Sequence, residues 1–401
     1  MDLSKLKSIE TVEVAGKRVL VRADLNVPMR DCKVSDDTRL VRLLPTLENL
    51  RKRGAVVLLV SHFGRPKGQI KPEFTLQPVA AHLRELATDT DVEFIETWDV
   101  AELQKRLADR PAGSVTVLEN LRFDPGEEAN APDFVKKISS VADIYVNDAF
   151  SASHRAHASI AGIPDHLPAF AGPLLMAEIN ALQSALGQPK RPVAALVGGA
   201  KVSTKIPVLS HLMEKVDVLI IGGGMANTFL FAKGYEVGTS LCEKDFKDTA
   251  LEILTRAEQL KTRIVLPSDV VVAEAFAEGS QHAVCDSADA PDDKMILDVG
   301  PQSLALLTGL LSDCETILWN GPLGAFEITP FGEGTIQFAR EVARQTRERG
   351  LISVAGGGDT VAALNAAGVT DQFSYVSTAG GAFLEWLEGR ELPGIVALIR
   401  N

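Results

Sequence analysis

The segment SVAGGGDTVAAL, residues 353–364, places three glycines and Asp359 between a short apolar run and the start of a predicted helix. Glycines let a ligand approach the main chain closely, and a helix N-terminus offers unpaired N–H groups and the positive end of the helix dipole. This combination predicts an anion site, with the Asp359 carboxylate as a ligand for a Mg²⁺ ion that also holds phosphate oxygens. A turn glycine with Asp359 as helix N-cap explains the local pattern equally well.

Two lysines follow another glycine pair in GGAKVSTKI, residues 198–206. Lys201 and Lys205 are four residues apart at the start of a predicted helix, which would place both ammonium groups on one face. Lysine in a first helical turn opposes the helix dipole, and a bound phosphate would explain why the sequence tolerates this. A solvent-exposed helix face is the alternative.

Arg39 is another cation at the start of a predicted helix, in the segment SDDTRLVRLLPTL, residues 35–47. The segment begins a predicted helix over residues 38–53, with Asp36 and Asp37 among its capping residues. Arg39 then lies in the first turn, where the dipole favours an anion. A surface pair with Asp36 is one explanation, and a role in binding an anion at the gap between two domains is the other.

Basic side chains follow the strands predicted for the first half of the chain. The apolar runs 18–23, 55–61, 114–118 and 143–147 predict strands, and 132–141 predicts a helix. The basic residues at or just after the ends of these strands are Arg22, His62, Arg65, Arg122, His154, Arg155 and His157. Parallel strands bind ligands outside their carboxyl ends, so we expect a pocket for an anionic small molecule. The histidines lack a third partner at metal-binding spacing, and Asp148 is better explained as a loop-holding residue than as a general base.

The strands predicted for the second half end mainly in glycine. Their sequences are PVAALVGGAK, VDVLIIGGGMAN, RIVLPSDV, TILWNGPLGAFE, LISVAGGGDT and YVSTAGGA. Glycines after successive strands allow a phosphorylated ligand to lie directly on the backbone. This half therefore predicts a nucleotide site. The patterns GxxxxGK[ST], HRD and DFG are absent, and GxGxxG is broken. The sequence therefore disfavours the common nucleotide-binding folds that carry these motifs, including a dehydrogenase.

The elements that must position these residues alternate between strand-length apolar runs and helical periodicity, which indicates βαβ units and parallel sheets. A chain of 401 residues, 46% hydrophobic and 23% charged, suits two globular domains. Four dispersed cysteines and a charged N-terminus favour a reducing cytoplasm, with no secretion signal or membrane span. A net charge of −12 disfavours nucleic-acid binding.

Eight motifs along the chain resemble those of the phosphoglycerate kinase family. They are RADLNVP, SHFGRPKG, LENLRF, NDAFSASHRAHAS, GGAKVSTKI, GGGMANTFL, WNGPLGAFE and GGGDT, and they occur in the family's order over nearly the whole length. The resemblance implies two Rossmann-like, doubly wound parallel-sheet domains facing across a cleft. It also implies reversible phosphoryl transfer from 1,3-bisphosphoglycerate to ADP, giving 3-phosphoglycerate and ATP in glycolysis and gluconeogenesis.

The resemblance further implies a set of site residues. The phosphoglycerate would be bound by Asp24, Asn26, Arg39, His62, Arg65, Arg122 and Arg155. The nucleotide would be bound by Gly199, Ala200, Lys201, Lys205, Gly223, Asn320, Pro322, Gly324, Glu327, Gly356, Gly357, Gly358, Asp359 and Thr360. Asp359 would hold Mg²⁺, and Arg39, Lys201 and Lys205 would stabilise the phosphoryl group and the nucleotide phosphates.

The domain organisation implied by the resemblance has four parts: a phosphoglycerate domain over residues 1–172, a hinge helix over 173–188, a nucleotide domain over 189–382, and a segment 383–401 that returns to the first domain. The helix is also expected from its apolar spacing and flanking prolines. Catalysis would require hinge-bending closure of the domains. A cytoplasmic monomer is expected from the family.

Two positions depart from the family pattern, which commonly has glycine at Ser151 and Ala379. Ala379 could restrict φ or crowd a phosphate at a point of close backbone approach. The alternative from another functional class is a catalytically silent binding or scaffold protein with the same fold. Loss of a key lysine, arginine or aspartate would favour that alternative, and none is lost here.

Overall fold

The computed structural model describes all residues 1–401 and divides into two compact units. Unit 1 comprises Met1–Ile179 and Glu391–Asn401, and unit 2 comprises Asn180–Arg390. The chain therefore passes between the units twice, once within α6 (Pro173–Leu182) and once before α14 (Pro393–Arg400). The sequence places the boundary near Gln188, whereas the compact units part at Ile179, inside the helix.

Unit 1 is built on a six-stranded parallel sheet in the order β5-β6-β4-β1-β7-β8. Its strands are β1 (Arg18–Arg22), β4 (Val56–Val60), β5 (Val92–Ile95), β6 (Val115–Leu118), β7 (Ile144–Asn147) and β8 (Ala169–Ala171). Its other helices are α1 (Thr38–Lys52), α2 (Gln77–Leu86), α3 (Val100–Ala108), α4 (Pro125–Ala129) and α5 (Pro132–Ser139). A short hairpin of β2 (Met29–Arg30) and β3 (Lys33–Val34) precedes α1.

Unit 2 repeats this plan with the strand order β11-β10-β9-β15-β16-β17. The strands are β9 (Val193–Val197), β10 (Val218–Ile221), β11 (Arg263–Val265), β15 (Thr316–Asn320), β16 (Ile352–Gly356) and β17 (Tyr375–Ser377). The helices are α7 (Ile206–Leu212), α8 (Gly224–Ala232), α9 (Lys247–Leu260), α10 (Pro301–Ser312), α11 (Glu333–Arg349), α12 (Gly358–Ala367) and α13 (Gly380–Leu387). An added antiparallel sheet, β13-β12-β14, is formed by β12 (Asp269–Ala273), β13 (His282–Asp286) and β14 (Met295–Val299).

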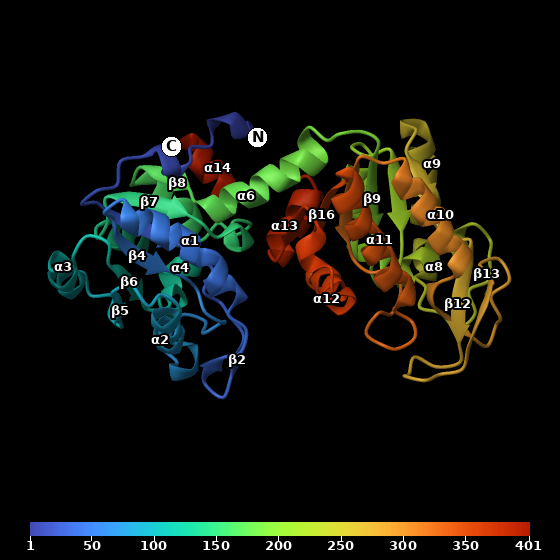
Figure 1. The fold of residues 1–401 in the computed structure, drawn as a ribbon, viewed down its shortest axis with the longest axis horizontal. Coiled ribbons are helices and arrows are strands. Elements are labelled where there is room, and N and C mark those ends of the chain that lie inside the picture. The colour runs from blue at the N-terminus through green and yellow to red at the C-terminus, as the bar shows by residue number, and fades with distance from the viewer. The chain divides into compact units, whose positions relative to one another are not determined.

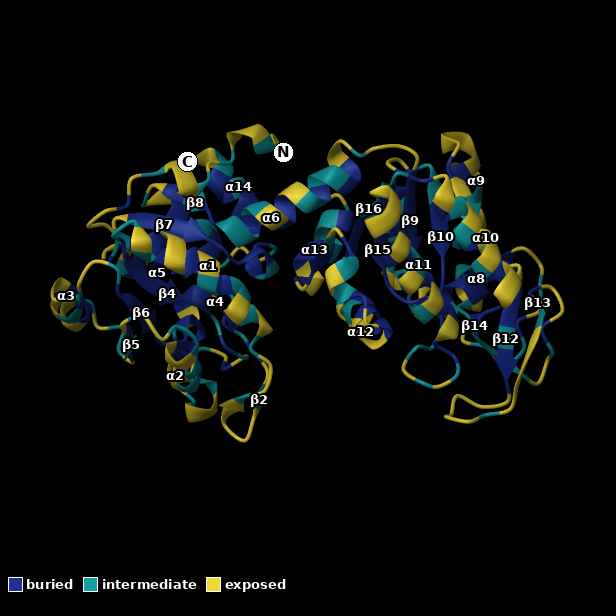
Figure 2. Cartoon of the chain, in the orientation of Figure 1, coloured by how far each residue is buried: buried dark blue, intermediate teal, exposed yellow.

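The central strands of both sheets are buried along their whole length, and helices flank the sheets with their outer faces exposed (Figures 1 and 2). This burial explains why the strands appear in the sequence as continuous apolar runs rather than alternating ones. The predicted α/β class with two Rossmann-like parallel sheets is confirmed. The antiparallel sheet and the hairpin were not predicted; β2 and β3 are only two residues long, whereas β12 does contain an apolar run over residues 270–273.

The sequence-based bounds differ little from the observed ones in unit 1. The predicted strands agree with β1, β4, β6 and β7 within one residue at each end, and the predicted helix 38–53 ends one residue earlier as α1. The predicted helix 132–141 ends at Ser139 as α5. The predicted connecting helix is α6, followed by one turn of π-helix over Gln183–Gly187.

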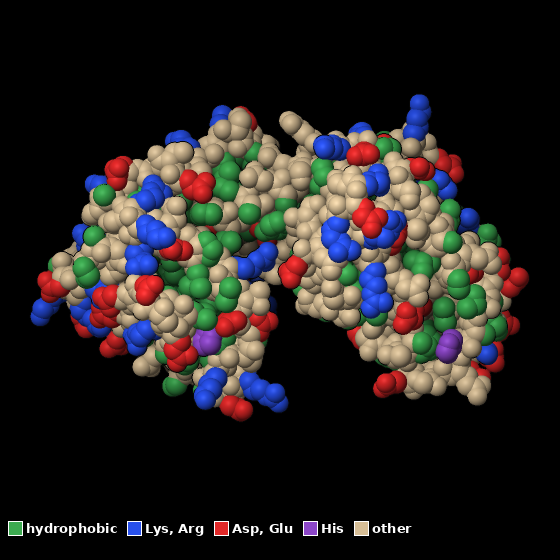
Figure 3. Space-filling view, in the orientation of Figure 1, with side chains coloured by type: hydrophobic (Ala, Val, Ile, Leu, Met, Phe, Trp, Pro, Cys, Tyr) green, Lys and Arg blue, Asp and Glu red, His purple; other side chains and the backbone are tan.

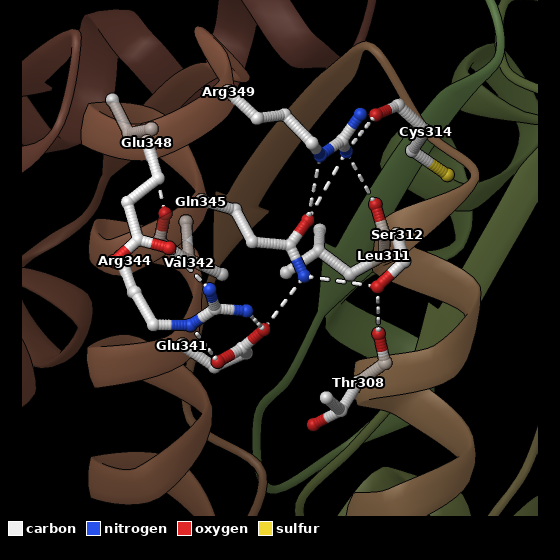
Figure 4. Close-up of polar contacts among 11 residues, drawn as sticks. Thr308, Leu311, Ser312, Cys314, Glu341, Val342, Arg344, Gln345, Glu348 and Arg349 are labelled. Carbon is white, nitrogen blue, oxygen red and sulfur yellow. Dashed lines mark hydrogen bonds and ion pairs between the residues drawn. The ribbon is translucent and has the colours of Figure 1, made fainter.

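The two helices α10 and α11 are joined by a polar network on the surface of unit 2 (Figure 4). The Arg349 guanidinium donates to the Leu311 carbonyl at 2.8 Å, near the C-terminus of α10. The Gln345 amide donates to the Ser312 hydroxyl at 3.2 Å and to the Glu341 carboxylate at 2.6 Å. A cation at a helix C-terminus satisfies carbonyls that have no partner within the helix. Elsewhere on the face shown in Figure 3, acidic and basic side chains are interspersed.

The C-terminal helix α14 belongs to unit 1 and contacts β8 (Figure 1). The Gly394 amide donates to the Ser153 carbonyl at 2.9 Å, and the Lys7 ammonium donates to the Asn401 carbonyl at 2.9 Å. Leu392, Ile395 and Leu398 are fully buried there.

None of the helices is both long enough and apolar enough to span a membrane.

Candidate active site

The candidate residues of unit 1 follow the ends of four neighbouring parallel strands. Asp24 and Asn26 follow β1, His62 and Arg65 follow β4, Arg122 follows β6, and Ser151 and Arg155 follow β7. The strand order changes direction between β1 and β7, and such a switch point is where open α/β sheets bind ligands. The topology therefore collects these side chains at one edge of the sheet.

Arg39 is held by the loop after β1 rather than by its own helix. Its Nη1 atom lies 3.0 Å from the Asp24 carboxylate and donates to the Asn26 carbonyl at 2.8 Å. Asp36 instead accepts from the Thr38 amide at 2.9 Å in the first turn of α1. The alternative in which Arg39 pairs with Asp36 is therefore wrong, because Arg39 pairs with the Asp24 carboxylate, which lies after β1. A guanidinium fixed on one side still presents donors on the other.

His62 lies among guanidinium groups. Arg22 Nη2 is 3.1 Å from His62 Nδ1. Burial, followed by the charges of Arg22, Arg122 and Arg39, holds the pKa of His62 well below its usual value. Burial, followed by Arg122, also lowers the pKa of His157 to about 4. Both imidazoles are therefore neutral near neutral pH, and the positive charge of the site comes from arginine.

The other candidate arginines of unit 1, Arg122, Arg155 and Arg65, differ in burial and in their contacts. Arg122 is 5% exposed, donates to the Gly64 carbonyl at 2.7 Å, and pairs with Glu128 at 3.1 Å. Burial lowers its pKa, and the nearby charge of Arg155 acts in the same direction. Arg155 and Arg65 are exposed. An anion would relieve this repulsion between like charges.

Asp148 is a structural residue. Its buried carboxylate accepts from the Thr46 hydroxyl at 2.8 Å and from the Leu174 and Leu175 amides at 2.7 and 3.2 Å. These amides are in the first turn of α6, so Asp148 caps the connecting helix. Burial raises its pKa. The interpretation of Asp148 as a loop-holding residue agrees with these contacts.

In unit 2, the glycines at the strand ends let loops pack against one another. A Cβ atom on Gly198 would lie 2.0 Å from the Pro322 carbonyl, and one on Gly321 would lie 2.3 Å from the Gly198 carbonyl. A Cβ on Gly223, whose φ is +67°, would lie 2.7 Å from the Gly199 carbonyl. Several of these glycines are thus required by backbone contact between loops rather than by a ligand alone.

Three polar side chains join the ends of β9, β15 and β16. The Lys205 ammonium donates to Asn320 Oδ1 at 2.7 Å, and Asn320 Nδ2 donates to the Gly356 carbonyl at 2.7 Å. The buried Thr360 hydroxyl accepts from the Gly321 amide at 2.7 Å. Burial lowers the pKa of Lys205, while Asp359 raises it. Lys205 is therefore a fixed cation close to Asp359.

The prediction that Lys201 and Lys205 lie on one face of a helix is wrong. Its backbone is extended, with φ −131° and ψ 131°, and helix α7 begins only at Ile206, after Lys205. Pro207 is the second residue of α7 and favours a helix start at this point. The two lysines therefore flank one turn of 3-10 helix, Val202–Thr204, and the Lys201 side chain is exposed.

The segment GGGDT lies where β16 ends and α12 begins. The N-cap is Gly357, with φ +102° and no side-chain capping bond, so Asp359 is not the N-cap. A Cβ on Gly358 would meet nothing within 4 Å. Open space, a helix N-terminus and an exposed carboxylate fit a Mg²⁺ ion that is also bound by phosphate oxygens. No group of three His, Cys, Asp or Glu residues could hold a metal unaided.

The remaining nucleotide candidates lie around these loops. Ala200 is exposed beside Lys201, and Pro322 and Gly324 are buried in the loop after β15. Glu327 is exposed in the same loop, three residues further on. A cavity of about 610 Å³ beside β11 contains none of the candidate residues, so it does not coincide with this site.

Known proteins match this chain over a range that includes the candidate residues of both units. The model of the family described as phosphoglycerate kinase matches residues 9–390. The chain is 54% identical to a phosphoglycerate kinase of Chelativorans sp. (strain BNC1), covering 96% of this chain and 97% of that one. It superposes on the structure of phosphoglycerate kinase from Coxiella burnetii with a TM-score of 0.92 and 43% identity, covering 98% of this chain and 99% of that one.

The chain belongs to the phosphoglycerate kinase family. The family resemblance seen in the sequence motifs is thereby confirmed, and membership makes the chain a kinase of glycolysis. The more distant phosphoglycerate kinase of Pyrococcus horikoshii OT3 has the same fold, with a TM-score of 0.79 and 31% identity over 98% of each chain.

Two departures from the phosphoglycerate kinase pattern have different structural consequences. The Ser151 hydroxyl donates to the Asp24 carboxylate, the same group that pairs with Arg39. Ala379 has φ −93° and ψ 25°, a conformation open to any L-residue, so its backbone does not require glycine. Local sequence patterns do not indicate the first contact, because Ser151 and Asp24 lie far apart in the chain.

One buried residue near the phosphoglycerate kinase motifs was missed by the sequence analysis. Glu127 is 0% exposed and accepts from both the amide and the hydroxyl of Ser159. In the sequence it lies in DPGEEAN, which has the composition of a solvent-exposed helix start. Neither spacing nor composition distinguishes a buried glutamate in such a segment.

Proposed function

We propose that the chain catalyses reversible phosphoryl transfer from 1,3-bisphosphoglycerate to ADP, giving 3-phosphoglycerate and ATP. Family membership supports this reaction. The observation that favours it most is that each unit holds a fixed cation beside the carboxyl ends of its parallel strands, Arg39 in unit 1 and Lys205 in unit 2. Fixed cations suit a reaction in which both substrates are anionic.

The phosphoglycerate is proposed to bind unit 1. Arg39, Arg65, Arg122 and Arg155 would neutralise its phosphate and carboxylate, since a planar guanidinium can bind either group in a bidentate manner. His62 would donate from a neutral ring, and Asp24 and Asn26 would orient Arg39 and the polar groups of the substrate.

The nucleotide is proposed to bind unit 2. Its phosphates would lie near Lys201, Lys205 and the N-terminus of α12, and its base near Gly223. Glu327 is an exposed acceptor suited to ribose hydroxyls. Asp359 would hold Mg²⁺, which supplies charge neutralisation to the nucleotide phosphates when bound.

The reaction needs no general base in the direction of ATP consumption, because the attacking carboxylate of 3-phosphoglycerate is already ionised. Catalysis then depends on positioning and charge stabilisation. Arg39 and Lys201 are proposed to stabilise the phosphoryl group in transfer. Because the two ligands bind different units, we propose that hinge bending at the helix over residues 173–188 brings them together.

The reaction is proposed to take place in the cytoplasm, with a monomeric enzyme. All four cysteines are free, which agrees with a reducing compartment.

The test is an assay of phosphoryl transfer from ATP to 3-phosphoglycerate, with and without Mg²⁺, coupled to consumption of the acyl phosphate product. We expect rapid turnover that depends on Mg²⁺. Binding of both ligands without turnover would contradict the proposal and favour a catalytically silent scaffold.

A further inference from the structure

A chain of buried polar groups lies behind His62. Arg22 is 1% exposed, and Ser159 and Glu127 are 0% exposed. Glu127 accepts from the Ser159 hydroxyl at 2.6 Å and from the Ser159 amide at 2.9 Å. The Ser159 hydroxyl in turn accepts from Arg22 Nε at 2.9 Å. The buried guanidinium is therefore linked to the Glu127 carboxyl group through one serine.

The other nitrogens of Arg22 fix the direction in which it points. Nη1 donates to the Ala23 carbonyl at 2.6 Å, and Nη2 lies 3.1 Å from His62 Nδ1. A guanidinium has only donors. His62 Nδ1 must then be the acceptor in this contact, so a neutral His62 has its proton on Nε2.

We propose that Glu127, Ser159 and Arg22 are positioning residues that hold His62 in the neutral Nε2–H form, so that it presents one fixed N–H donor to an anionic oxygen of the phosphoglycerate. The nitrogen that bears the proton in a histidine is set by the hydrogen bond at the other nitrogen. This inference rests on the proposed function, which places the phosphoglycerate beside His62.

The electrostatic surroundings of His62 favour the same form. The charged and titratable groups that act on it are Arg22 from β1, Arg122 after β6, Arg39 from α1 and His157 after β7. None of these is a carboxylate, and burial also disfavours the imidazolium. His62 thus donates a hydrogen bond without adding a charge that would vary with pH.

Glu127 has a separate part in this arrangement. A buried guanidinium is costly unless it is paired and its donors are satisfied. Glu127 orients the Ser159 hydroxyl so that its lone pair faces Arg22 Nε. Without Glu127, the serine could turn away and the guanidinium could move from His62.

The test is NMR spectroscopy of the full chain with ¹⁵N-labelled histidine, with the His62 signals assigned by their loss in His62→Gln. For the unmodified chain we expect a protonated Nε2 and an unprotonated Nδ1 near neutral pH, with no titration of His62 near its ordinary value of about 6.5. In Arg22→Met/Glu127→Gln, which removes both buried charges together, we expect mixed tautomers and a pKa closer to that value.

The same variants separate positioning from general damage. We expect Arg22→Met/Glu127→Gln to raise KM for 3-phosphoglycerate by about tenfold, the effect of one lost hydrogen bond, with kcat and KM for ATP little changed. Tyr145→Phe is the matched control, because the tyrosine hydroxyl donates to the Ser159 carbonyl in the same cluster, whereas Arg22 donates to the Ser159 hydroxyl. It should leave the His62 tautomer unchanged.

A proton on Nδ1 in the unmodified chain, or an unchanged tautomer and titration in the double variant, would overturn the inference. Failure of the proposed function would appear differently, because 3-phosphoglycerate would then leave the His62 Nε2 signal unmoved although the tautomer was as expected.

Discussion

At the scale of single residues, the candidate cations are held in place by the chain itself. Asp24 and the Asn26 carbonyl fix Arg39, and Asn320 fixes Lys205. A cation that is already oriented costs little reorganisation when charge develops during phosphoryl transfer. Arg65, Arg155 and Lys201 are exposed and have more freedom. The sites thus combine cations that the chain holds in place with cations that are exposed.

Replacing Arg39 should show this difference. We expect Arg39→Ala to lower kcat by at least about a hundredfold, because loss of an oriented charge at the transferring group costs about 2.7–4 kcal/mol in comparable sites, while the Kd for ATP changes little. Arg39→Lys keeps the charge but loses the planar guanidinium, so its kcat should lie between that of the unmodified enzyme and that of Arg39→Ala. Turnover near that of the unmodified enzyme in Arg39→Ala would show that Arg39 does not stabilise the transferring group.

Ser151 should affect substrate binding through Asp24. Its hydroxyl donates to the Asp24 carboxylate that pairs with Arg39. We expect Ser151→Gly to raise KM for 3-phosphoglycerate by about two- to tenfold, because a net hydrogen bond is worth about 0.5–1.5 kcal/mol. Ser140→Gly is a control at an exposed serine that bonds only to its own helix. Equal KM values for the two variants would argue against a role for Ser151.

At the scale of elements, the loop that follows β15 is held from two sides. The Thr335 hydroxyl at the start of α11 accepts from the Leu323 and Gly324 amides at 3.0 and 3.3 Å. The buried Asp298 of β14 accepts from the Gly334 amide at 2.9 Å, and a Cβ on Gly324 would lie 2.2 Å from its carboxylate. The added antiparallel sheet thus supports a loop that contains nucleotide candidates.

Asp298 should make the stability of unit 2 depend on pH. Burial raises the pKa of Asp298 to about 7, from the usual aspartate value of 3.8. Between these values the folded chain binds a proton that the unfolded chain does not, so the contribution of Asp298 to the free energy of unfolding falls as pH rises from about 4 to about 7.

Denaturant unfolding at several pH values can test this expectation against Asp298→Asn. The unmodified chain should lose stability relative to the variant as pH rises through this window, by up to about 1.4 kcal/mol per unit of pKa shift. Thr335→Val is the control, because it disturbs the same loop without a titrating group. A difference between the unmodified chain and Asp298→Asn that is constant with pH would contradict the assigned cause.

At the scale of the whole molecule, the chain returns to unit 1 after completing unit 2. Helix α14 and the residue before it bury Leu392, Ile395 and Leu398 in unit 1. Each fully buried leucine or isoleucine contributes about 1.5–3 kcal/mol. The last residues of the chain are therefore part of the core of the first unit.

Deletion of residues 391–401 should destabilise unit 1 by several kcal/mol and leave unit 2 much less affected. The tryptophans allow the units to be followed separately, because Trp98 lies in unit 1 and Trp319 and Trp386 lie in unit 2. Unfolding would be monitored by fluorescence in Trp319→Phe/Trp386→Phe and in Trp98→Phe, with and without the deletion. An equal loss in both units would show that α14 stabilises more than unit 1.

The amino-acid sequence alone predicts the class of the fold, most strands, the basic and glycine-rich strand ends, and the family. These features depend on neighbouring residues: a strand buried on both faces needs a continuous apolar run, and helices need their own periodicity. The motifs that identify the family are likewise short and contiguous. None of them requires knowledge of distant contacts.

Which side chains meet depends on how the chain folds in three dimensions. Arg39 pairs with Asp24, 15 residues away, rather than with Asp36, and Arg22 meets Ser159 across 137 residues. Glu127 is buried although its sequence resembles an exposed helix start. Such pairings follow from the order of strands in a sheet, which brings distant strand ends together. Local spacing cannot specify them, because strand order depends on how the whole chain packs.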